Sequence, residues 1–262
     1  MFAEERQVMI VERVSERGRV TVSDLAEQLG ITPETVRRDL ATLETARQLR
    51  RVHGGAVAMH KFSMSEPSLS ERQTQRHDEK TRIAAAALVL IPASRTTSVI
   101  LDAGTTTERL AERLAEWEPA IPGEQLLVIT NAVPIAYKLS SNPEIQLHIL
   151  GGRVRGLTSA VVGAKTTEQL ETLRPDIAFI GANGVDADFG FSTPDSLEAA
   201  VKTAIVRSAR RVVALVDSSK LGVQTLVRFA ALGEIDTLIT EEPPPPGLAA
   251  ALFAADVEVV IA

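Results

Sequence analysis

The stretch Thr32-Pro33-Glu34-Thr35-Val36-Arg37-Arg38-Asp39-Leu40 predicts a short helix with one narrow apolar face. Thr32 is expected to cap this helix, because its hydroxyl can accept a hydrogen bond from the free amides of the first turn. Pro33 then occupies the first helical position, where no backbone N–H is needed. The apolar residues recur at helical spacing and are Val36, Leu40 and Leu43.

The opposite face of this helix is basic. Arg38 lies on that face and Arg37 lies at its flank, and a short helix of this kind fits the major groove of DNA. Two arginines on their own more often mark a solvated surface. The DNA interpretation therefore depends on the segments before and after the helix.

Both flanking segments favour DNA binding. Residues 23–30 predict a two-turn helix with Ser23 as its cap, so the two helices would form a helix-turn-helix. Residues 49–57 alternate loosely around a Gly-Gly turn and predict a β-hairpin, or wing, to which residues 20–22 would add a third strand. The side chains expected to contact DNA are Ser23, Thr32, Thr35, Arg37, Arg38, Arg50, Arg51 and His53.

These pieces resemble the signature of the DeoR family of bacterial transcription regulators. The resemblance is carried by Val22-Ser23-Asp24-Leu25-Ala26, by Thr35-Val36-Arg37-Arg38-Asp39-Leu40 and by Arg51-Val52-His53-Gly54-Gly55-Ala56. It implies an N-terminal winged helix-turn-helix domain that binds double-stranded operator DNA.

The charge of the chain is distributed unevenly. The net charge of −6 argues against a general polyanion binder, yet residues 35–55 hold five arginines that are opposed only by Asp39 and Glu44. Because phosphate binding depends on where the charge sits, this segment still predicts a local DNA-binding surface.

Composition excludes several kinds of site. The chain of 262 residues has no cysteine, which excludes disulfides, Cys-ligated zinc, iron–sulfur clusters and thiol chemistry. Its histidines, at positions 53, 60, 77 and 148, show no metal-ligand spacing, so no metal is expected. No apolar leader and no run of about 18 apolar residues is present, so we expect a cytoplasmic protein without a membrane span.

The sequence divides into three parts. Residues 1–58 are expected to form the winged helix-turn-helix domain, opening with a helix whose apolar face carries Val8, Val11 and Val14. Residues 59–77 predict a Ser-rich linker with a short helix near its end. Residues 78–262 alternate helices with apolar strands, which predicts a Rossmann-like, mostly parallel α/β domain. The expected strands are 98–101, 126–130, 145–150, 177–180, 212–216, 237–240 and 257–261.

Ligands of such sheets bind beyond the carboxyl ends of the strands. Residues 102–107, Asp-Ala-Gly-Thr-Thr-Thr, follow a strand and open a helix, so their amides, hydroxyls and helix dipole predict an anion site. The segment is neither a dinucleotide-binding G-x-G-x-x-G nor a Walker loop, which favours the phosphate of a small molecule over a nucleotide. Alternatively, the three threonines only cap the helix.

Other polar residues are expected at the same edge of the sheet. Any one of them alone would more often be a surface lysine, a salt-bridge partner or a turn residue; their convergence supports a site. With the Thr-rich loop, the candidates for effector binding are Asp102, Gly104, Thr105, Thr106, Thr107, Asn131, Gly151, Gly152, Arg153, Asn183, Asp186, Glu198, Lys202 and Lys220.

These segments also resemble the C-terminal sensor domain of the DeoR family, so the resemblance covers nearly the whole chain. It implies a domain related in fold to sugar-phosphate isomerases and coenzyme A transferases, a phosphorylated sugar as effector, and a homodimer or homotetramer that represses a sugar operon. Residues 131–136 and 190–202 look most similar to fructose-operon repressors, which respond to fructose phosphates such as fructose 1-phosphate.

The expected function is thus a sugar-phosphate-responsive repressor without enzymatic activity. One alternative is a sugar-phosphate isomerase-like enzyme, with Glu198 or Asp186 as base and Lys220 as electrostatic partner. A second alternative is a DNA-tethered interaction module without a small ligand.

Overall fold

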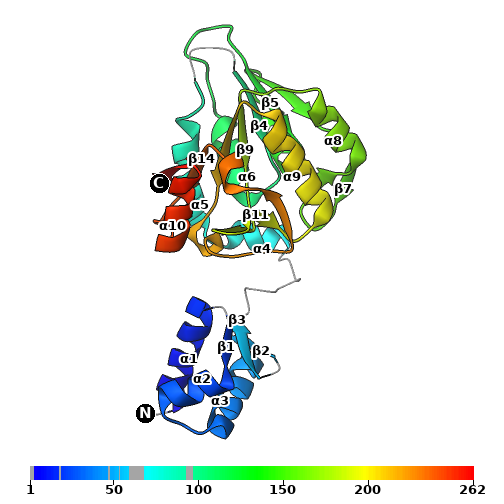
Figure 1. Cartoon of the computed structure of the whole chain (residues 1–262). Helices are drawn as coiled ribbons and strands as arrows, with labels where there is room; N and C mark the ends of the chain where they lie inside the picture. Colours follow the sequence, from blue (N-terminus) through cyan, green and yellow to red (C-terminus); the bar gives the residue numbers. More distant parts are fainter. Residues whose placement is uncertain (1–2, 18, 47, 53, 59–67, 93–96) are drawn as a thin grey trace. The chain divides into compact units, whose positions relative to one another are not determined.

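The chain forms two compact units, Met1–Ser65 and Glu66–Ala262 (Figure 1). The computed structural model describes residues 3–17, 19–46, 48–52, 54–58, 68–92 and 97–262. Each unit has its own hydrophobic core, so each is described by itself.

The first unit packs three helices against a small antiparallel sheet of order β1-β3-β2. Its elements are α1 (Ala3–Arg17), β1 (Arg19–Thr21), α2 (Val22–Leu29), α3 (Pro33–Thr45), β2 (Leu49–Val52) and β3 (Gly55–Ala58). The predicted apolar seam of α3 is fully buried in the core of this unit. Thr32 caps α3 by accepting from the Thr35 amide at 3.3 Å, and Pro33 takes the first helical position, as the sequence predicts.

Two local predictions in the first unit are wrong. The cap of α2 is Thr21, whose hydroxyl accepts from the Asp24 amide, while Ser23 lies exposed inside the helix and shares a hydrogen bond with the Thr21 hydroxyl. In α1, Val14 faces the core and Val11 packs against it as predicted, but Ile10 takes the remaining core position and Val8 is 58% exposed. A spacing of four residues places side chains on one face more closely than the three-residue spacing on which the prediction relied.

The predicted hairpin is present and depends on both of its glycines. β2 pairs with β3, and β3 pairs with β1, all antiparallel. Gly54 has a φ of 81°, a left-handed conformation that favours glycine. At Gly55 an added Cβ would lie 2.0 Å from the Val20 carbonyl oxygen, so the close approach of β1 requires a residue without a side chain.

The first unit also contains a buried ion pair. Arg6 of α1 donates from Nε to Asp39 of α3 at 2.6 Å and from a terminal nitrogen at 3.1 Å. Both side chains are less than a tenth exposed. Asp39 therefore connects α1 to α3. Its negative charge is buried and paired with Arg6, so it does not reduce the positive charge on the exposed face of α3.

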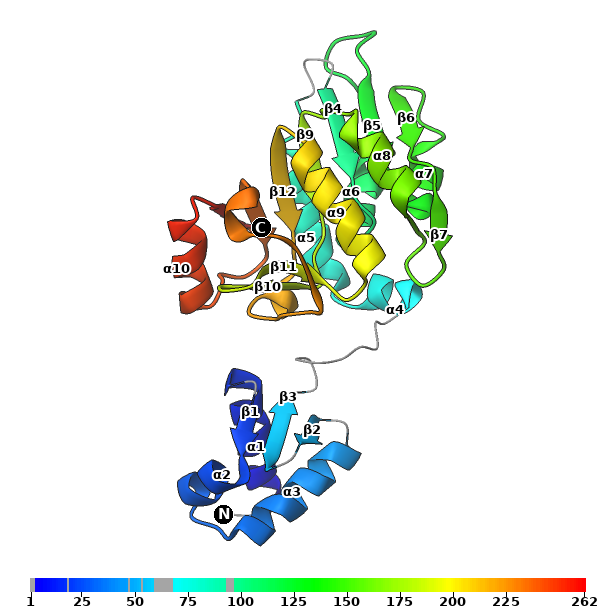
Figure 2. The ribbon, with the colours of Figure 1, turned by 45° about the vertical axis from the view of Figure 1, so that its right-hand side comes forward.

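All seven strands predicted for the second unit are present and lie in one sheet, part of which is seen in Figure 2. Its order is β15-β14-β12-β9-β4-β5-β6, and every neighbouring pair is parallel. The strands are β4 (Thr97–Leu101), β5 (Leu126–Thr130), β6 (Ile145–Ile149), β9 (Ile177–Ile180), β12 (Arg211–Leu215), β14 (Thr237–Thr240) and β15 (Glu258–Ile261).

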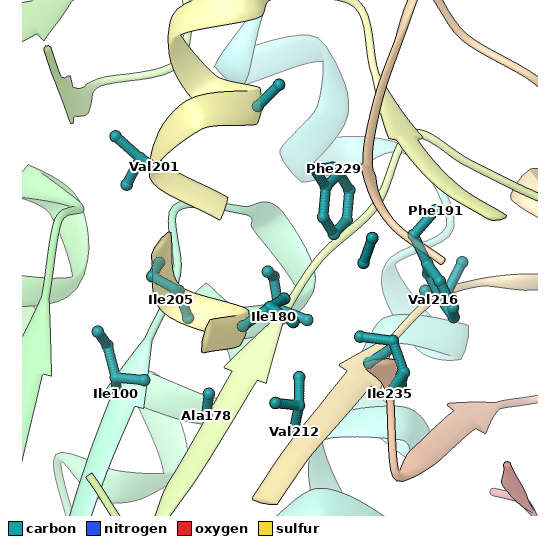
Figure 3. Packing of buried hydrophobic residues seen from close by; sticks show 14 of the residues in the cluster. Ile100, Ala178, Ile180, Phe191, Val201, Ile205, Val212, Val216, Phe229 and Ile235 are labelled. Atoms are coloured by element: carbon teal, nitrogen blue, oxygen red, sulfur yellow. The ribbon is translucent and has the colours of Figure 1, made fainter. Parts of the chain in front are cut away.

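Helices cover both faces of this sheet, because alternate residues of the strands point to opposite sides. On one face Ile100, Ala178, Ile180 and Val212 pack against α9 and its neighbours (Figure 3). On the other face Val99, Leu101, Phe179 and Val213 pack against α5, α6 and α7. The helices are α5 (His77–Leu88), α6 (Thr105–Leu114), α7 (Val133–Leu139), α8 (Ala164–Glu171), α9 (Ser196–Ser208) and α10 (Pro246–Ala254).

The second unit also contains two smaller sheets. Strands β10 (Gly184–Asp186), β11 (Gly190–Thr193) and β13 (Val227–Ala230) form an antiparallel sheet, and β7 (Arg153–Arg155) pairs with β8 (Ala160–Val162). None of these segments is among the strands that the sequence predicts, because most of them mix polar with apolar residues and lack the continuous apolar run of the central strands. Two short 3₁₀ helices, Ser218–Lys220 and Leu232–Glu234, follow β12 and β13.

A short helix, α4 (Leu69–Thr74), lies near the end of the segment predicted as a linker. A capping box between Ser68 and Glu71 starts it. It contacts α6 of the second unit, because Gln73 donates to both carboxylate oxygens of Glu108, at 3.0 and 2.9 Å. The second unit accordingly begins at Glu66, before the predicted domain start at residue 78.

Candidate functional site

A pocket of about 100 Å³ opens at the carboxyl ends of β4, β9 and β12. From the centre of the sheet, β4, β5 and β6 follow one another in one direction, while β9, β12, β14 and β15 follow in the other. The direction therefore switches between β4 and β9. At such a switch the flanking loops diverge and leave a crevice, and this is where open α/β sheets bind ligands.

Cations outnumber acids among the side chains that line the pocket. The acids are Glu198 and Asp217, and the bases are Arg72, Arg76, Lys80, Lys202 and Lys220. The first turn of α6 also faces the pocket with Thr105 and Thr106, and the first amides of a helix have no partner within it. A pocket with this charge and a helix N-terminus suits an anion.

The wall of the pocket contains a buried ion pair between α9 and the end of β4. Lys202 donates to the Asp102 carboxylate and, at 2.9 Å, to the Gly181 carbonyl; its ammonium lies 5.5 Å from the centre of the Phe229 ring. Both partners are at least 95% buried. Burial raises the pKa of Asp102, and the charge of Lys202 opposes that rise. The pair fixes α9 against the sheet at the edge of the pocket.

Glu198, one turn before Lys202 on α9, is held from the other side. Its carboxylate accepts from the Thr158 hydroxyl and from Arg155 at 3.1 Å. Arg155 also forms an ion pair with Asp195, the cap of α9, at 3.2 Å. The β7–β8 hairpin thus orients the acidic part of the pocket wall.

Four lining residues come from a segment in which the sequence predicts no functional residue: Arg72, Gln75, Arg76 and Lys80. Lys80 is buried, and its ammonium donates to the carbonyls of Arg72 at 2.6 Å and Gln75 at 2.7 Å. Burial lowers the pKa of Lys80 to about 8, although the charge of Asp217 works against this. Two arginines and a lysine within residues 72–80 of a polar stretch were the sequence signal available.

Arg76 joins this segment to the strand ends. It has a φ of 51° and donates to Glu241 at 2.6 Å and to the Ser218 hydroxyl at 2.9 Å. The hydrogen bond to Glu241 raises the pKa of Arg76. Asp217 lies 3.6 Å from its Nε. Part of the positive charge of the pocket is therefore neutralised within the protein.

The structure brings together about half of the predicted effector-binding residues. Asp102 does not line the pocket itself, but it forms an ion pair with Lys202, which does. On the wall itself are Gly104, Thr105, Thr106, Asn183, Glu198, Lys202 and Lys220. The predicted residues that do not line this pocket are Thr107, Asn131, Gly151, Gly152, Arg153 and Asp186.

Strand order explains most of these differences. Residues 151–153 follow β6, the edge strand, two strands away from β4. Gly152 allows its backbone to pack closely against Thr166, because an added Cβ would lie 2.3 Å from the Thr166 hydroxyl oxygen. Asn131 follows β5. Its side-chain oxygen accepts a hydrogen bond from the Ala103 amide at 3.1 Å, and its side-chain nitrogen donates to the Val161 carbonyl at 3.2 Å, so Asn131 holds the loop after β4 in place.

Two other candidates shape turns. The Thr107 hydroxyl is fully buried and donates to the carbonyls of Asp102 at 2.7 Å and Gly104 at 2.9 Å. Asp186 accepts from the amides of Asp188 and Phe189, both at 3.0 Å, and shapes the turn between β10 and β11.

Neither a metal site nor a membrane-spanning helix is found in the parts of the chain that the structure describes. No group of three or more histidines or carboxylates there could hold a metal ion. None of the described helices combines the length and the apolar character that crossing a membrane requires.

In the first unit, α3 exposes the residues predicted to read DNA. Arg37 and Arg38 are exposed, and Arg37 pairs with Glu34 at 3.1 Å. Thr35 is half-buried and shares a hydrogen bond with the Thr32 hydroxyl at 2.9 Å. Arg51 is exposed on β2 and Arg50 lies in the same strand, while the prediction for His53 falls outside the described residues.

Comparison with known proteins agrees with this architecture. Residues 6–62 match the model of the DeoR-like helix-turn-helix domain, and residues 75–242 match that of the DeoR C-terminal sensor domain. The chain is 31% identical over 241 residues to the uncharacterized HTH-type transcriptional regulator FruR of Bacillus subtilis, covering 92% of each. It is 31% identical over 236 residues to the glycerol-3-phosphate regulon repressor of Escherichia coli, covering 90% of each.

Among solved structures, ribose 5-phosphate isomerase A from Methanocaldococcus jannaschii matches 56% of this chain with 55% of its own length, at 20% identity and a TM-score of 0.39. The two family models together span most of the chain, and the curated relatives match along nearly their whole length. The chain therefore belongs to the DeoR family of transcriptional regulators, with a helix-turn-helix domain followed by a sensor domain.

Proposed function

We propose that this protein represses a sugar-utilisation operon. A phosphorylated sugar or polyol, bound in the pocket of the second unit, would modulate the affinity of the repressor for operator DNA. The observation that carries the proposal is the pocket itself, where five basic side chains and the start of α6 surround two acids. Fructose 1-phosphate is the first effector to test, because of the resemblance of residues 131–136 and 190–202 to fructose-operon repressors.

The pocket suits a phosphate joined to a hydroxylated body. Thr105, Thr106 and Lys220 offer hydroxyl and ammonium donors to a phosphate. Asn183 and Glu198, on the same wall, offer oxygen acceptors for sugar hydroxyls. A phosphate can accept charge-assisted hydrogen bonds that an uncharged sugar cannot, so the phosphorylated form should bind much more tightly than its parent sugar.

Regulation requires that the effector distinguish two states of the repressor. A ligand with equal affinity for both states would shift nothing, however tightly it binds. A symmetric dimer or tetramer would bind two half-sites of an operator with dyad symmetry, and the effector would favour the arrangement that cannot hold both. The relatives named above are regulators, which favours a sensor domain without turnover.

The recognition helix gives the first prediction. Replacing Arg38 with alanine should weaken operator binding by about 1–3 kcal/mol, roughly 5- to 150-fold, because an exposed arginine can form two hydrogen bonds to a guanine edge. Fluorescence anisotropy with operator and scrambled duplexes measures this, and discrimination between them should fall too. Arg210→Ala, which removes an exposed arginine from the second unit, is the matched control. Unchanged affinity and selectivity in the Arg38 variant would remove α3 from base recognition.

The pocket gives the second prediction. In a thermal-shift screen of the full chain against sugar phosphates and their unphosphorylated parents, one phosphosugar should stabilise the second unit, by about 2.7 kcal/mol at a hundredfold excess over Kd. Lys220→Ala should greatly reduce the shift, whereas Lys165→Ala, at an exposed lysine of α8, should keep it. If no sugar phosphate shifts either variant or the wild type, the sensor proposal fails and a protein partner becomes the better candidate.

The enzymatic alternative loses one of its two candidate bases, because Asp186 shapes a turn and does not line the pocket. Glu198 lines the pocket but is held by Arg155 and Thr158. We therefore expect no conversion of the stabilising sugar phosphate, followed by NMR over hours at high protein concentration. Measurable turnover that Glu198→Gln abolishes would overturn this expectation.

A further inference from the structure

We propose that α4 and the first turn of α5, residues 69–80, form a docking segment that an anion in the pocket locks onto the second unit, so that effector binding alters the connection to the first unit. This inference rests on the proposed function, because it describes how ligand binding in the same pocket would change DNA binding by the first unit. It differs from that function in its test, which follows the docking segment itself.

Polar contacts hold α4 in place. No residue of α4 is buried. Its attachments include the Leu69 amide to the Leu157 carbonyl at 3.2 Å, Gln73 to Glu108, and Arg109 to the Gln73 carbonyl at 3.2 Å. Hydrogen bonds that can be exchanged for bonds to water contribute little net stability. The helix α4 itself is therefore attached weakly enough for a ligand of ordinary affinity to shift its equilibrium, whereas Arg76, which follows it, is held more firmly by its ion pair with the buried Glu241.

The docking segment supplies one wall of the pocket. Arg72, Gln75, Arg76 and Lys80 belong to it, and Thr105, Thr106 and Lys220 on the opposite side belong to the body of the second unit. An anion that contacts both groups is bound fully only when the segment is docked. Its affinity for the docked state therefore exceeds its affinity for the undocked state, which is the condition for a population shift.

Charge repulsion inside the pocket strengthens this coupling. The charges of Lys220, Arg72 and Arg109 lower the pKa of Lys80, in addition to the larger effect of its burial, while the charge of Asp217 raises it by more than any one of these three lowers it. Lys80 also ties the end of α4 to α5 through the carbonyls of Arg72 and Gln75. Asp217 and Glu241 offset part of this repulsion when the segment is docked, and an anion between the cations would offset more of it.

The position of the segment in the chain makes its docking consequential. α4 begins at Leu69, and the last strand of the first unit, β3, ends at Ala58. Undocking of residues 69–75 would lengthen the connection between the units by up to roughly 23–25 Å, at 3.3–3.6 Å per residue. Since the effective concentration of one binding module near its site depends on connection length, the docked and undocked states would engage paired half-sites differently.

Hydrogen exchange of the full-length protein, followed by mass spectrometry, tests the proposal with inorganic phosphate as the probe and chloride at matched ionic strength as the control. We expect phosphate to slow exchange of peptides covering residues 69–80 about tenfold or more. Gln73→Ala removes the contact with Glu108 but no pocket residue, and it should speed exchange of the same peptides without phosphate. Lys165→Ala should behave as the wild type.

The outcomes separate the docking segment from the pocket. If phosphate raises the melting temperature of the second unit but leaves exchange of residues 69–80 unchanged, the docking proposal is overturned and the anion site stands. If phosphate changes neither, both fall. If phosphate slows exchange but Gln73→Ala leaves operator affinity and its response to phosphate unchanged, the segment docks without acting on DNA binding, and the regulatory proposal is overturned.

Discussion

Replacing Asp39 with alanine is expected to unfold the first unit while leaving the second unit folded. The substitution leaves the Arg6 guanidinium buried without its partner, and breaking a buried ion pair from one side costs about 3–5 kcal/mol. A domain of this size often has no more stability than that to lose. Operator binding should disappear although Asp39 itself is not exposed to DNA.

Calorimetry of the full chain measures this effect, since the two units should melt separately. Asp39→Ala should remove or strongly lower the transition of the first unit and leave that of the second in place. The double variant Arg6→Met/Asp39→Ala removes both charges and should recover a large part of the loss. A single variant that melts like the wild type would show that the pair does not stabilise α1 against α3.

Replacing Lys202 with methionine should be the most damaging single change in the second unit. It leaves the Asp102 carboxylate buried and unpaired, and we expect a loss of about 3–5 kcal/mol near pH 7. Burial already raises the pKa of Asp102, and the loss of the Lys202 charge would raise it further.

The pH dependence of this variant has a definite sign. An acid whose pKa is higher in the folded than in the unfolded state binds its proton more tightly when folded. Stability therefore falls as pH rises from the unfolded pKa, near 3.8, through the raised folded pKa. Urea denaturation of Lys202→Met should show a deficit relative to the wild type that is smaller at pH 5 than at pH 7.

The matched control removes the other charge as well. Asp102→Asn combined with Lys202→Met leaves no buried ion and should recover much of the stability at pH 7, with the pH dependence of the single variant lost. If the stability deficit of Lys202→Met is the same at pH 5 and pH 7, the loss comes from the missing contact with Phe229 and not from the unpaired Asp102 carboxylate.

Much of the fold could be predicted from the sequence, because its signals are local. The cap at Thr32, the proline at the first helical position and the apolar seam all act within one turn of α3, and the structure confirms each of them. The inner strands of the large sheet were also predictable, since strands buried on both faces are continuously apolar, whereas the edge strands β6 and β15 are partly exposed. Ser23 failed as a cap because Thr21, two residues earlier, can make the same hydrogen bond.

The pocket was harder to predict because its members depend on strand order. The Thr-rich loop could be found because a strand, a glycine and a helix start are adjacent in the chain. The contribution of Arg72 and Lys80 could not, because α4 reaches the pocket through contacts with α6, more than thirty residues away. Nor does the sequence say that β6 lies at the edge of the sheet, which is why residues 151–153 were expected at the pocket.

The topology of the central sheet also sets the order in which the working parts of the protein arise during synthesis. The first unit closes its sheet between residues at most 38 positions apart, as in Arg19 with Val57, and can fold once Ser65 has emerged. The pocket needs β4 to pair with β9, with Val99 opposite Ile177, and then needs Lys220 beyond β12. At about 5–20 residues per second, the intervening 155 or so residues take roughly 8–30 s to make. Under the proposed function, each new chain can hold DNA before it can sense its effector.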